Sequence, residues 1–287
     1  MKLSIIIVNF NGVNVTKNCI SSLYRFLDVQ ESEVIVVDNN SSDASRTELP
    51  ALFPQIVFHQ LHENKGFGAA NNAGAKIASG EILFFLNNDT LLTSEITEKL
   101  TRILMSVESY GIVAPRLMNG NGSFQLSFGK HPTIANEMNS RKRSNDLAAQ
   151  QLEAPLDNHP VQKEWVTGAA FLIRKMLFQQ IGGFNEEYFM YFEDADICKR
   201  VRNVGYSVWY VPEASLIHLG GMSYTKGNQQ IEYEYRRSQL LFYSEHNTFF
   251  EQCLVRIFLW MKYVPQLFLQ SRRSMALKIL SLTISRS

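Results

Sequence analysis

Short apolar runs that end in polar residues alternate with helix-like spacing over the first hundred residues. Runs of this kind are typical of buried strands. The expected strands are Leu3–Val8, Glu33–Asp38, Gln55–Gln60 and Ile82–Leu86. The expected helices are a segment with Val15, Cys19, Leu23 and Phe26 on one face, then Phe67–Ser79, then a segment that begins near Ser94. Strands alternating with helices predict an α/β fold in which helices cover both faces of a mainly parallel sheet.

Polar side chains follow three of these strands. Asn9, Asp38 and Asp89 lie at or just past the carboxyl ends, and sheets of this type bind ligands beyond that edge. Each aspartate could instead be a turn or cap residue, because aspartate favours such positions. Their joint placement at one edge favours a ligand site.

The second half of the sequence carries an acidic cluster where a helix is expected to begin. Glu193, Asp194 and Asp196 form this cluster, which could also do no more than complement the helix dipole. Upstream, residues 119–163 lack periodicity apart from a hairpin expected near Ser123–Lys130, and we interpret the basic triplet Arg141–Arg143 as a solvated surface. The other expected elements are a strand at Trp165–Ile173, a short helix that ends at Gly182-Gly183, and strands at Tyr206–Val211 and Ala214–His218.

Charge and cysteine spacing exclude several classes of protein. A formal net charge of +1 argues against a nucleic-acid-binding protein that relies on counterion release. The 3 cysteines form no CxxC pair, so neither a disulfide framework nor a zinc site is expected, and a reducing compartment is favoured. The apolar run at Leu3–Val8 is too short for a signal peptide, and no segment reaches the ~20 apolar residues that cross a bilayer. A cytoplasmic protein is expected.

The C-terminal segment is basic and apolar. Residues 252–287 include six basic residues and no acidic ones, and Leu254–Gln270 is strongly apolar although Pro265 interrupts it. This composition predicts a helix in the plane of an anionic membrane surface, peripheral on the inner face of the cell membrane. A helix packed on the body of the protein is the alternative.

A glycine-rich stretch, Asn64–Asn72, precedes one of the expected helices. As a dinucleotide-binding fingerprint it is weak, because Asn71 stands where the third glycine is needed. A glycine-rich turn before a helix still offers backbone N–H groups to a phosphate.

Seven blocks, in order along the chain, resemble glycosyltransferase family 2, and specifically its bacterial rhamnosyltransferase-like branch. The blocks are SIIIVNFNG, VIVVDNNSSD, NKGFGAANNAG, FLNNDT, WVTGAAFLIRK, GGFNEEYFMYFEDADICKR and HLGGMSY. We therefore expect a GT-A catalytic domain over residues 1–221, with a nucleotide-binding half at about 1–115 and an acceptor half at about 116–221. A C-terminal helical segment is expected at 222–287.

The resemblance implies which residues bind the donor. Asp38, helped by Asn9, matches the position that holds the base or ribose of the nucleotide, and Lys65 and Asn72 lie in the block that lines the nucleotide and diphosphate pocket. Asn87-Asn88-Asp89 takes the place of the DxD metal motif. Asn88 would then contact the donor, and Asp89 would be the metal-binding carboxylate.

The resemblance also implies the remaining metal ligand and the catalytic base. His218 matches a histidine that completes the metal site in some members, although a lone histidine at a strand end is more often structural. Because Asn87 replaces the first acid of the DxD motif, a loosely held Mg²⁺ or Mn²⁺ is expected. Asp194 of the Glu193-Asp194 pair matches the base, whereas helical spacing alone leaves open which acid of the cluster serves.

Acceptor contacts are less well defined by the sequence. Trp165 and Asp196 are the expected acceptor residues, with a buried core tryptophan as the alternative for Trp165. Arg236 and Arg237 could meet the donor diphosphate or lie on an exposed helix face.

The implied reaction is an inverting transfer of a sugar. We expect L-rhamnose to move from dTDP-rhamnose to a hydroxyl of a saccharide or polyprenyl-diphosphate-linked acceptor, in bacterial cell-surface polysaccharide synthesis. A carboxylate takes the acceptor proton, while a metal stabilises the leaving diphosphate. A hexosyltransferase that uses a UDP-sugar and a catalytically inactive sugar-nucleotide-binding homologue are the alternatives. A nucleotidyltransferase is disfavoured, because the turn after the first strand lacks a glycine-rich basic loop.

Overall fold

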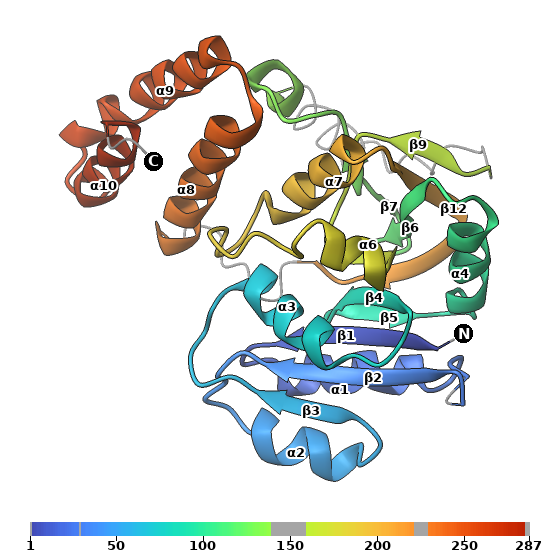
Figure 1. Ribbon diagram of the computed structural model, residues 1–287. Helices are drawn as coiled ribbons and strands as arrows, with labels where there is room; N and C mark the ends of the chain where they lie inside the picture. Colours follow the sequence, from blue (N-terminus) through green and yellow to red (C-terminus); the bar gives the residue numbers. More distant parts are fainter. Residues whose placement is uncertain (1, 29, 139–158, 221–228, 285–287) are drawn as a thin grey trace.

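A computed structural model describes residues 2–28, 30–138, 159–220 and 229–284. The expected basic triplet Arg141–Arg143 lies outside these ranges. The chain folds into a large mixed sheet with helices on both faces and a helical region at the C-terminal end (Figure 1). This architecture confirms the predicted α/β fold class.

The sheet has the strand order β3-β2-β1-β4-β11-β6-β12-β5. The bounds are β1 Leu3–Asn9, β2 Ser32–Asp38, β3 Val57–Gln60, β4 Ile82–Asn87, β5 Thr90–Leu92, β6 Tyr110–Met118, β11 Ala170–Arg174 and β12 Ser207–His218. Strands β3, β2, β1 and β4 pair in parallel, as β6 and β12 do, whereas β11 and β5 run antiparallel to their neighbours. The sheet is therefore mainly parallel, as predicted.

The register of the parallel strands brings the expected polar residues to one edge. Asn9 is opposite Asp38 across the β1–β2 pair, and Val8 is opposite Asn87 across the β1–β4 pair. Because β1 is buried on both faces between β2 and β4, its polar end has neighbours on two sides. The candidate site is built on this edge.

Alternate side chains of the central strands enter two cores, one on each face. Ile5 and Ile7 face the core covered by α1, α2 and α4, and Ile6 faces the core covered by α3, α6 and α7. The helix bounds are α1 Val13–Leu23, α2 Ser45–Leu52, α3 Phe67–Ile77, α4 Thr97–Ser106, α6 Lys175–Gln180 and α7 Glu193–Asn203. Residues buried on both faces explain why the strands read as continuous apolar runs.

Four predicted elements differ in the structure. The expected hairpin near Ser123–Lys130 is absent from the described chain, because β7 (Phe124–Gln125) pairs with β6 and β8 (Phe128–Gly129) pairs with β10. The expected strand Trp165–Ile173 is split into β10 (Trp165–Val166) and β11. The two expected last strands form one strand, β12, with a register shift between Val211 and Ser215. A short strand β9 (Val161–Lys163) pairs with the outer part of β12.

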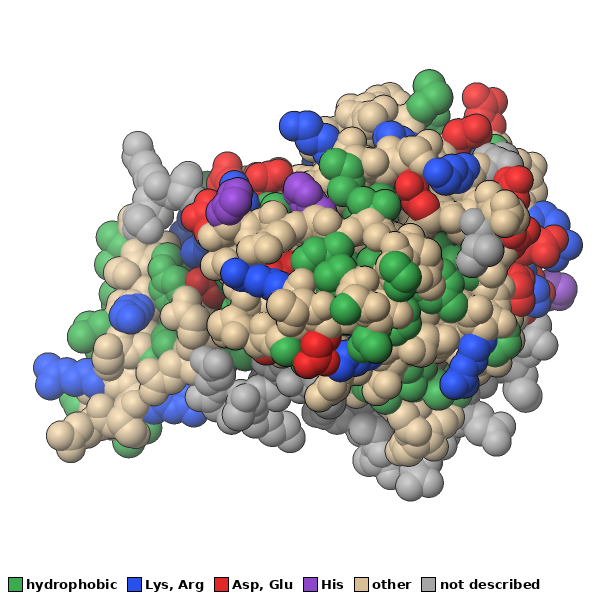
Figure 2. All heavy atoms as spheres, turned by 90° about the horizontal axis from the view of Figure 1, so that it is seen from below, with side chains coloured by type: hydrophobic (Ala, Val, Ile, Leu, Met, Phe, Trp, Pro, Cys, Tyr) green, Lys and Arg blue, Asp and Glu red, His purple; other side chains and the backbone are tan. Residues whose placement is uncertain are grey.

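The C-terminal region consists of α8 (Gln229–His246), α9 (Phe249–Tyr263), a 3₁₀ turn at Pro265–Phe268 and α10 (Arg273–Ile284). Pro265 interrupts the apolar segment Leu254–Gln270 as expected: α9 ends at Tyr263, and Pro265 has no N–H to continue the helix. A third core joins these helices to Tyr188 and Phe192 of the main body. Figure 2 shows hydrophobic and basic side chains on the lobe that α9 and α10 form. In the described ranges, no helix is both long and apolar enough to span a bilayer.

Candidate active site

A buried hydrogen-bond network joins the carboxyl ends of β1, β2 and β4. Asn9 Nδ2 donates to Asp38 Oδ1 at 2.9 Å and to Ser41 Oγ at 3.0 Å. Thr16 Oγ1 donates to Asn9 Oδ1 at 2.7 Å and accepts from Asn88 Nδ2 at 2.9 Å. The structure thus brings together three predicted donor-binding residues, Asn9, Asp38 and Asn88. It adds Thr16, which contacts the remote Asn88, and Ser41, which contacts the remote Asn9.

Asp38 is fully buried, and both of its carboxylate oxygens accept hydrogen bonds from other groups of the protein. Oδ1 accepts from Asn9, whereas Oδ2 accepts from the Ser41 N–H at 3.0 Å and lies 3.6 Å from Arg46 Nε. These contacts fix the loop that follows β2. Asp38 therefore shapes the rim of the candidate nucleotide site, and its direct contact with a nucleotide stays a prediction.

The glycine-rich turn before α3 has its first N–H groups occupied. The Lys65 N–H donates to Asn39 Oδ1, the Gly66 N–H to Asn64 Oδ1, and the Phe67 N–H to the carbonyl of Phe189. The expected phosphate-binding use of these three groups is therefore not supported. Gly66 has φ +86°, and a Cβ at this position would overlap the Phe189 backbone. The glycine is required by a close approach of two backbones.

Lys65 and Asn72 lie on opposite sides of this turn. The exposed Lys65 ammonium lies 3.6 Å from Glu63. Asn72 instead holds the segment before the acidic cluster, because Nδ2 donates to the Phe184 carbonyl and Oδ1 accepts from the Phe184 N–H, both at 2.9 Å. Asn72 also binds Glu186. The structure therefore does not bring these two side chains together.

His218 and Asp89 face each other at the end of β4. His218 Nε2 lies 3.1 Å from Asp89 Oδ1, and the Asn87 amide nitrogen lies 3.4 Å from the same Nε2. Gln125 sets the tautomer of the ring: its Nε2 donates to Asn119 Oδ1 at 3.2 Å, so its Oε1 accepts from His218 Nδ1 at 2.7 Å. A neutral imidazole held in this way presents a lone pair at Nε2.

This donor set fits a divalent cation. A lone pair and a carboxylate oxygen 3.1 Å apart repel each other unless a proton or a cation lies between them. Neighbouring ligands of an octahedral Mg²⁺ or Mn²⁺, each about 2.1 Å from the ion, are about 3 Å apart. Asp89 and His218 can therefore hold such an ion. Gln125 was missed because it lies in a stretch without periodicity.

A pocket of about 430 Å³ adjoins these residues. Asn87 lines it, as do Glu193 and Asp194 at the start of α7 and Trp165 on β10. Four further aromatic side chains line it: Phe67, Tyr191, Phe192 and Tyr235. Trp165 Nε1 donates to the Lys130 carbonyl at 2.7 Å, which fixes the indole against the pocket. The pocket is large enough for a saccharide, and aromatic faces suit the apolar faces of sugar rings.

Glu193 and Asp194 have different surroundings. Burial raises the pKa of Asp194, but its carboxylate accepts from the N–H groups of Gly168 (3.1 Å) and Ala195 (2.7 Å), which counteract that effect. Burial and the adjacent Asp194 charge raise the pKa of Glu193 well above its usual range, and Glu193 Oε2 is without a hydrogen-bond partner in the described chain. Paired carboxyls with unequal surroundings divide the roles of acid and base. The pKa of Glu193 is thus raised further than that of Asp194, so Asp194 gives up its proton more readily than Glu193 does.

The residues just before this pair have an unusual backbone. Tyr191 and Phe192 both have φ +67°, a left-handed conformation that costs about 1–2 kcal/mol for each non-glycine residue. Helix α8 holds the segment in place, because Ser238 Oγ donates to the Met190 carbonyl at 2.8 Å and the Tyr235 ring packs against Phe192. Strain of this kind clusters at functional sites, where the surroundings maintain it.

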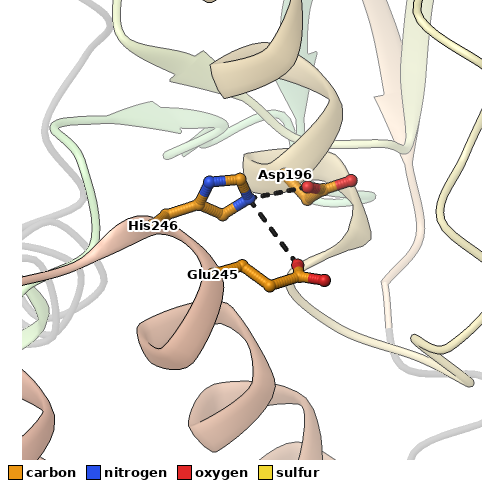
Figure 3. A group of neighbouring side chains, drawn as sticks. All are labelled: Asp196, Glu245 and His246. Atoms are coloured by element: carbon orange, nitrogen blue, oxygen red, sulfur yellow. Dashed lines mark hydrogen bonds and ion pairs between the residues drawn. The ribbon is translucent and has the colours of Figure 1, made fainter.

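Asp196 is not among the pocket residues and instead belongs to a cluster with Glu245 and His246 (Figure 3). Its Oδ1 accepts from His246 Nε2 at 2.7 Å, and its Oδ2 binds the Arg200 guanidinium at 2.6 Å and 2.9 Å. Glu245 lies 3.8 Å from His246 and accepts from the Tyr188 hydroxyl. The acids and the histidine lie close enough to hold an ion, but Arg200 and Tyr188 already satisfy the carboxylates. The cluster ties α8 to α7, and the expected acceptor contact of Asp196 is not supported.

Arg236 and Arg237 are also directed away from the candidate site. The buried Arg236 guanidinium binds Tyr263 Oη and Gln239 Oε1, between α8 and α9. Arg237 binds Glu234 and the carbonyl of Glu187. Arg236 is thus neither an exposed residue nor a pocket residue, and it stabilises the C-terminal helices.

Solved structures share this architecture. GalNAc-T7 with UDP, GalNAc and Mn²⁺ matches 85% of the chain and 50% of its own length, with a TM-score of 0.62 and 14% identity. The mannosyltransferase PcManGT from Pyrobaculum calidifontis, in complex with GDP-Man and Mn²⁺, matches 99% of the chain and 86% of its own length, with a TM-score of 0.59 and 13% identity. The sheet, its polar edge and these matches define a GT-A glycosyltransferase fold.

Sequence comparison then assigns the family. The model of glycosyl transferase family 2 matches residues 4–196, and the chain belongs to this family of glycosyltransferases. An L-rhamnosyltransferase of Mycobacterium tuberculosis, which acts on N-acetylglucosaminyl-diphospho-decaprenol, is 44% identical over 64% of the chain and 66% of its own length. The low-salt glycan biosynthesis hexosyltransferase Agl10 of Haloferax volcanii is 27% identical over 89% of the chain and 78% of its own length.

Proposed function

We propose that this glycosyltransferase transfers L-rhamnose, with inversion, from dTDP-L-rhamnose to a hydroxyl of a polyprenyl-diphosphate-linked saccharide in cell-surface polysaccharide synthesis. The observation that carries the proposal is the 44% identity to the mycobacterial rhamnosyltransferase over 64% of the chain. The donor would lie along the edge formed by Asn9, Asp38 and Asn88. The acceptor would enter the aromatic pocket beside Asp194.

The proposed chemistry assigns one task to each group. The Asp194 carboxylate takes the proton of the acceptor hydroxyl. At the same time, the oxygen of that hydroxyl forms a bond to C1 of the sugar. The bond from C1 to the diphosphate oxygen breaks on the opposite side, and its electron pair leaves with the nucleoside diphosphate. Mg²⁺ or Mn²⁺, held by Asp89 and His218, would stabilise the charge on that leaving group. Protonated Glu193 would donate a hydrogen bond to the acceptor.

A donor screen tests the proposal. The protein is incubated with dTDP-rhamnose, UDP-glucose, UDP-galactose or UDP-N-acetylglucosamine, a polyprenyl-diphosphate-linked N-acetylglucosamine acceptor and Mn²⁺. Nucleoside diphosphate release that depends on the acceptor should be highest with dTDP-rhamnose. Turnover with a UDP-sugar alone would contradict the rhamnosyl assignment while leaving the family assignment intact.

A hexosyltransferase that uses a UDP-sugar is the second candidate. It is favoured by the archaeal hexosyltransferase relative, whose match extends over more of the chain than the rhamnosyltransferase match does. The same screen distinguishes the two candidates. In either case, a lipid-linked acceptor would require the enzyme to work peripherally at the cytoplasmic face of a membrane.

A further inference from the structure

Helix α9 carries two apolar stripes, of which one is buried. Val255, Leu259 and Tyr263 are fully buried against α8 and α10. The second stripe faces solvent: its exposed fractions are 69% for Phe250, 38% for Leu254, 53% for Ile257 and 66% for Met261. Spacings of four, three and four residues place these four side chains on one helix face. The fold therefore leaves this face without a partner among the described residues.

The flanking segments also expose apolar side chains. Phe249, Phe268 and Leu269 are exposed at the two ends of α9, and Leu277 is exposed on α10. Helices α9 and α10 pack on each other through a shared core, and Trp260 Nε1 donates to Thr283 Oγ1 at 2.9 Å. The exposed apolar side chains thus project from two packed helices.

Charge selects the kind of partner. Residues 252–287 contain six basic residues and no acidic ones. Lys262 and Arg272 are near Glu232, at 3.6 Å and 3.0 Å, whereas Arg273 and Lys278 are exposed on α10. Apolar side chains interspersed with basic ones suit an anionic lipid surface, where each nearby basic residue adds about 1 kcal/mol of attraction. Figure 2 shows this mixture on the C-terminal lobe.

The exposed face begins next to the pocket wall. Asn247, at the turn between α8 and α9, donates from Nδ2 to the Pro132 carbonyl at 2.9 Å and lies 3.1 Å from His131 Nε2. Pro132 lines the pocket, and Phe249 and Phe250 follow Asn247 after one residue, Thr248. A lipid-linked acceptor could therefore place its sugar in the pocket while its lipid remains in the membrane.

We infer that the Phe250–Leu254–Ile257–Met261 face of α9, together with Arg273 and Lys278, binds an anionic membrane surface. The inference deepens the proposed function, because the membrane would hold the lipid-linked acceptor. The binding itself needs no donor or metal, so it can be measured independently of sugar transfer.

Vesicle sedimentation tests the inference on the full chain. Wild type should sediment with phosphatidylglycerol-containing vesicles and far less with pure phosphatidylcholine vesicles. The triple variant Phe250→Ser, Ile257→Ser, Met261→Ser should lose at least ~100-fold in partition coefficient, because each side chain loses most of its apolar transfer free energy. Met176→Ser, at a position on α6 that is 82% exposed, is the control away from α9 and should bind as wild type does.

The charge contribution has its own variant. Arg273→Gln with Lys278→Gln should weaken binding most at low salt, because salt screens the attraction. Unchanged sedimentation of the triple variant, or equal loss in the control, would overturn the inference. The inference would also be overturned if the wild type formed a dimer in solution and did not bind vesicles, while the triple variant was a monomer. A triple variant that loses vesicle binding but transfers sugar normally to a water-soluble acceptor would support the inference. A wild type that binds vesicles but transfers no sugar would count against the proposed function alone.

Discussion

Replacing Gln125 with leucine should weaken metal binding without touching a metal ligand. In the wild type, Gln125 Oε1 accepts from His218 Nδ1 at 2.7 Å, which leaves Nε2 free to face Asp89. Leucine cannot accept this hydrogen bond, so the ring can rotate or adopt the other tautomer. Loss of such a supporting contact typically lowers metal affinity 10–100-fold, which corresponds to about 1.4–2.8 kcal/mol. Gln125→Glu keeps the acceptor and should retain the affinity.

Electron paramagnetic resonance of Mn²⁺ gives this affinity directly, with the nucleoside diphosphate present. Gln162→Leu, the same change at an exposed position on β9, controls for a general effect of the substitution. Mn²⁺ affinity of Gln125→Leu within twofold of wild type would refute the role given to this glutamine. If His218→Ala also kept full affinity, the whole assignment of the metal site would be wrong.

Three further predictions concern the acidic pair and its supports. Glu193→Gln should raise the melting temperature by a few degrees. Because the pKa of Glu193 is raised in the fold, its contribution to stability is present at low pH and is lost as the pH rises through that pKa. Glutamine stays neutral, so the gain in melting temperature should grow with pH in thermal unfolding. Gly66→Ala should cost more than about 2 kcal/mol in urea unfolding, and Gly182→Ala, with a similar φ of +80° but open space around it in the described chain, should cost less. His246→Ala should lower turnover about tenfold at unchanged donor affinity, because its ring holds Asp196 on the first turn of α7; equal loss of donor affinity would contradict this.

The central strands and the polar edge could be predicted because their signals are local. Leu3–Val8 and Ile82–Leu86 are buried on both faces, so every position except Ser4 is apolar and the pattern is clear. Strand ends then placed Asn9 and Asp38 at one edge, and the register confirms it. By contrast, β6 was missed, and α2 contains Pro50 in a weakly apolar segment that gives no clear helical pattern.

Contacts between remote segments could not be predicted. The pairing of β8 with β10 joins Phe128 to Val166, and neither segment is long enough to give a pattern of its own. The orienting contact of Gln125 with His218 spans 93 residues. Likewise, the link from His246 to Asp196 depends on where α8 packs, which the spacing of charges does not reveal. For this reason Asp196 was expected in the acceptor site although it faces α8.

The proposed mechanism depends most directly on Asp194 as the base. Asp194→Asn retains the size of the side chain and removes the oxygen that takes the proton. Loss of general-base assistance should lower turnover by about 10²–10⁴-fold, or roughly 3–5 kcal/mol of barrier. Donor affinity measured by calorimetry should stay unchanged, because the donor would bind at the edge formed by Asn9, Asp38 and Asn88. Turnover within a few-fold of wild type, or loss of donor binding together with activity, would show that Asp194 is not the base.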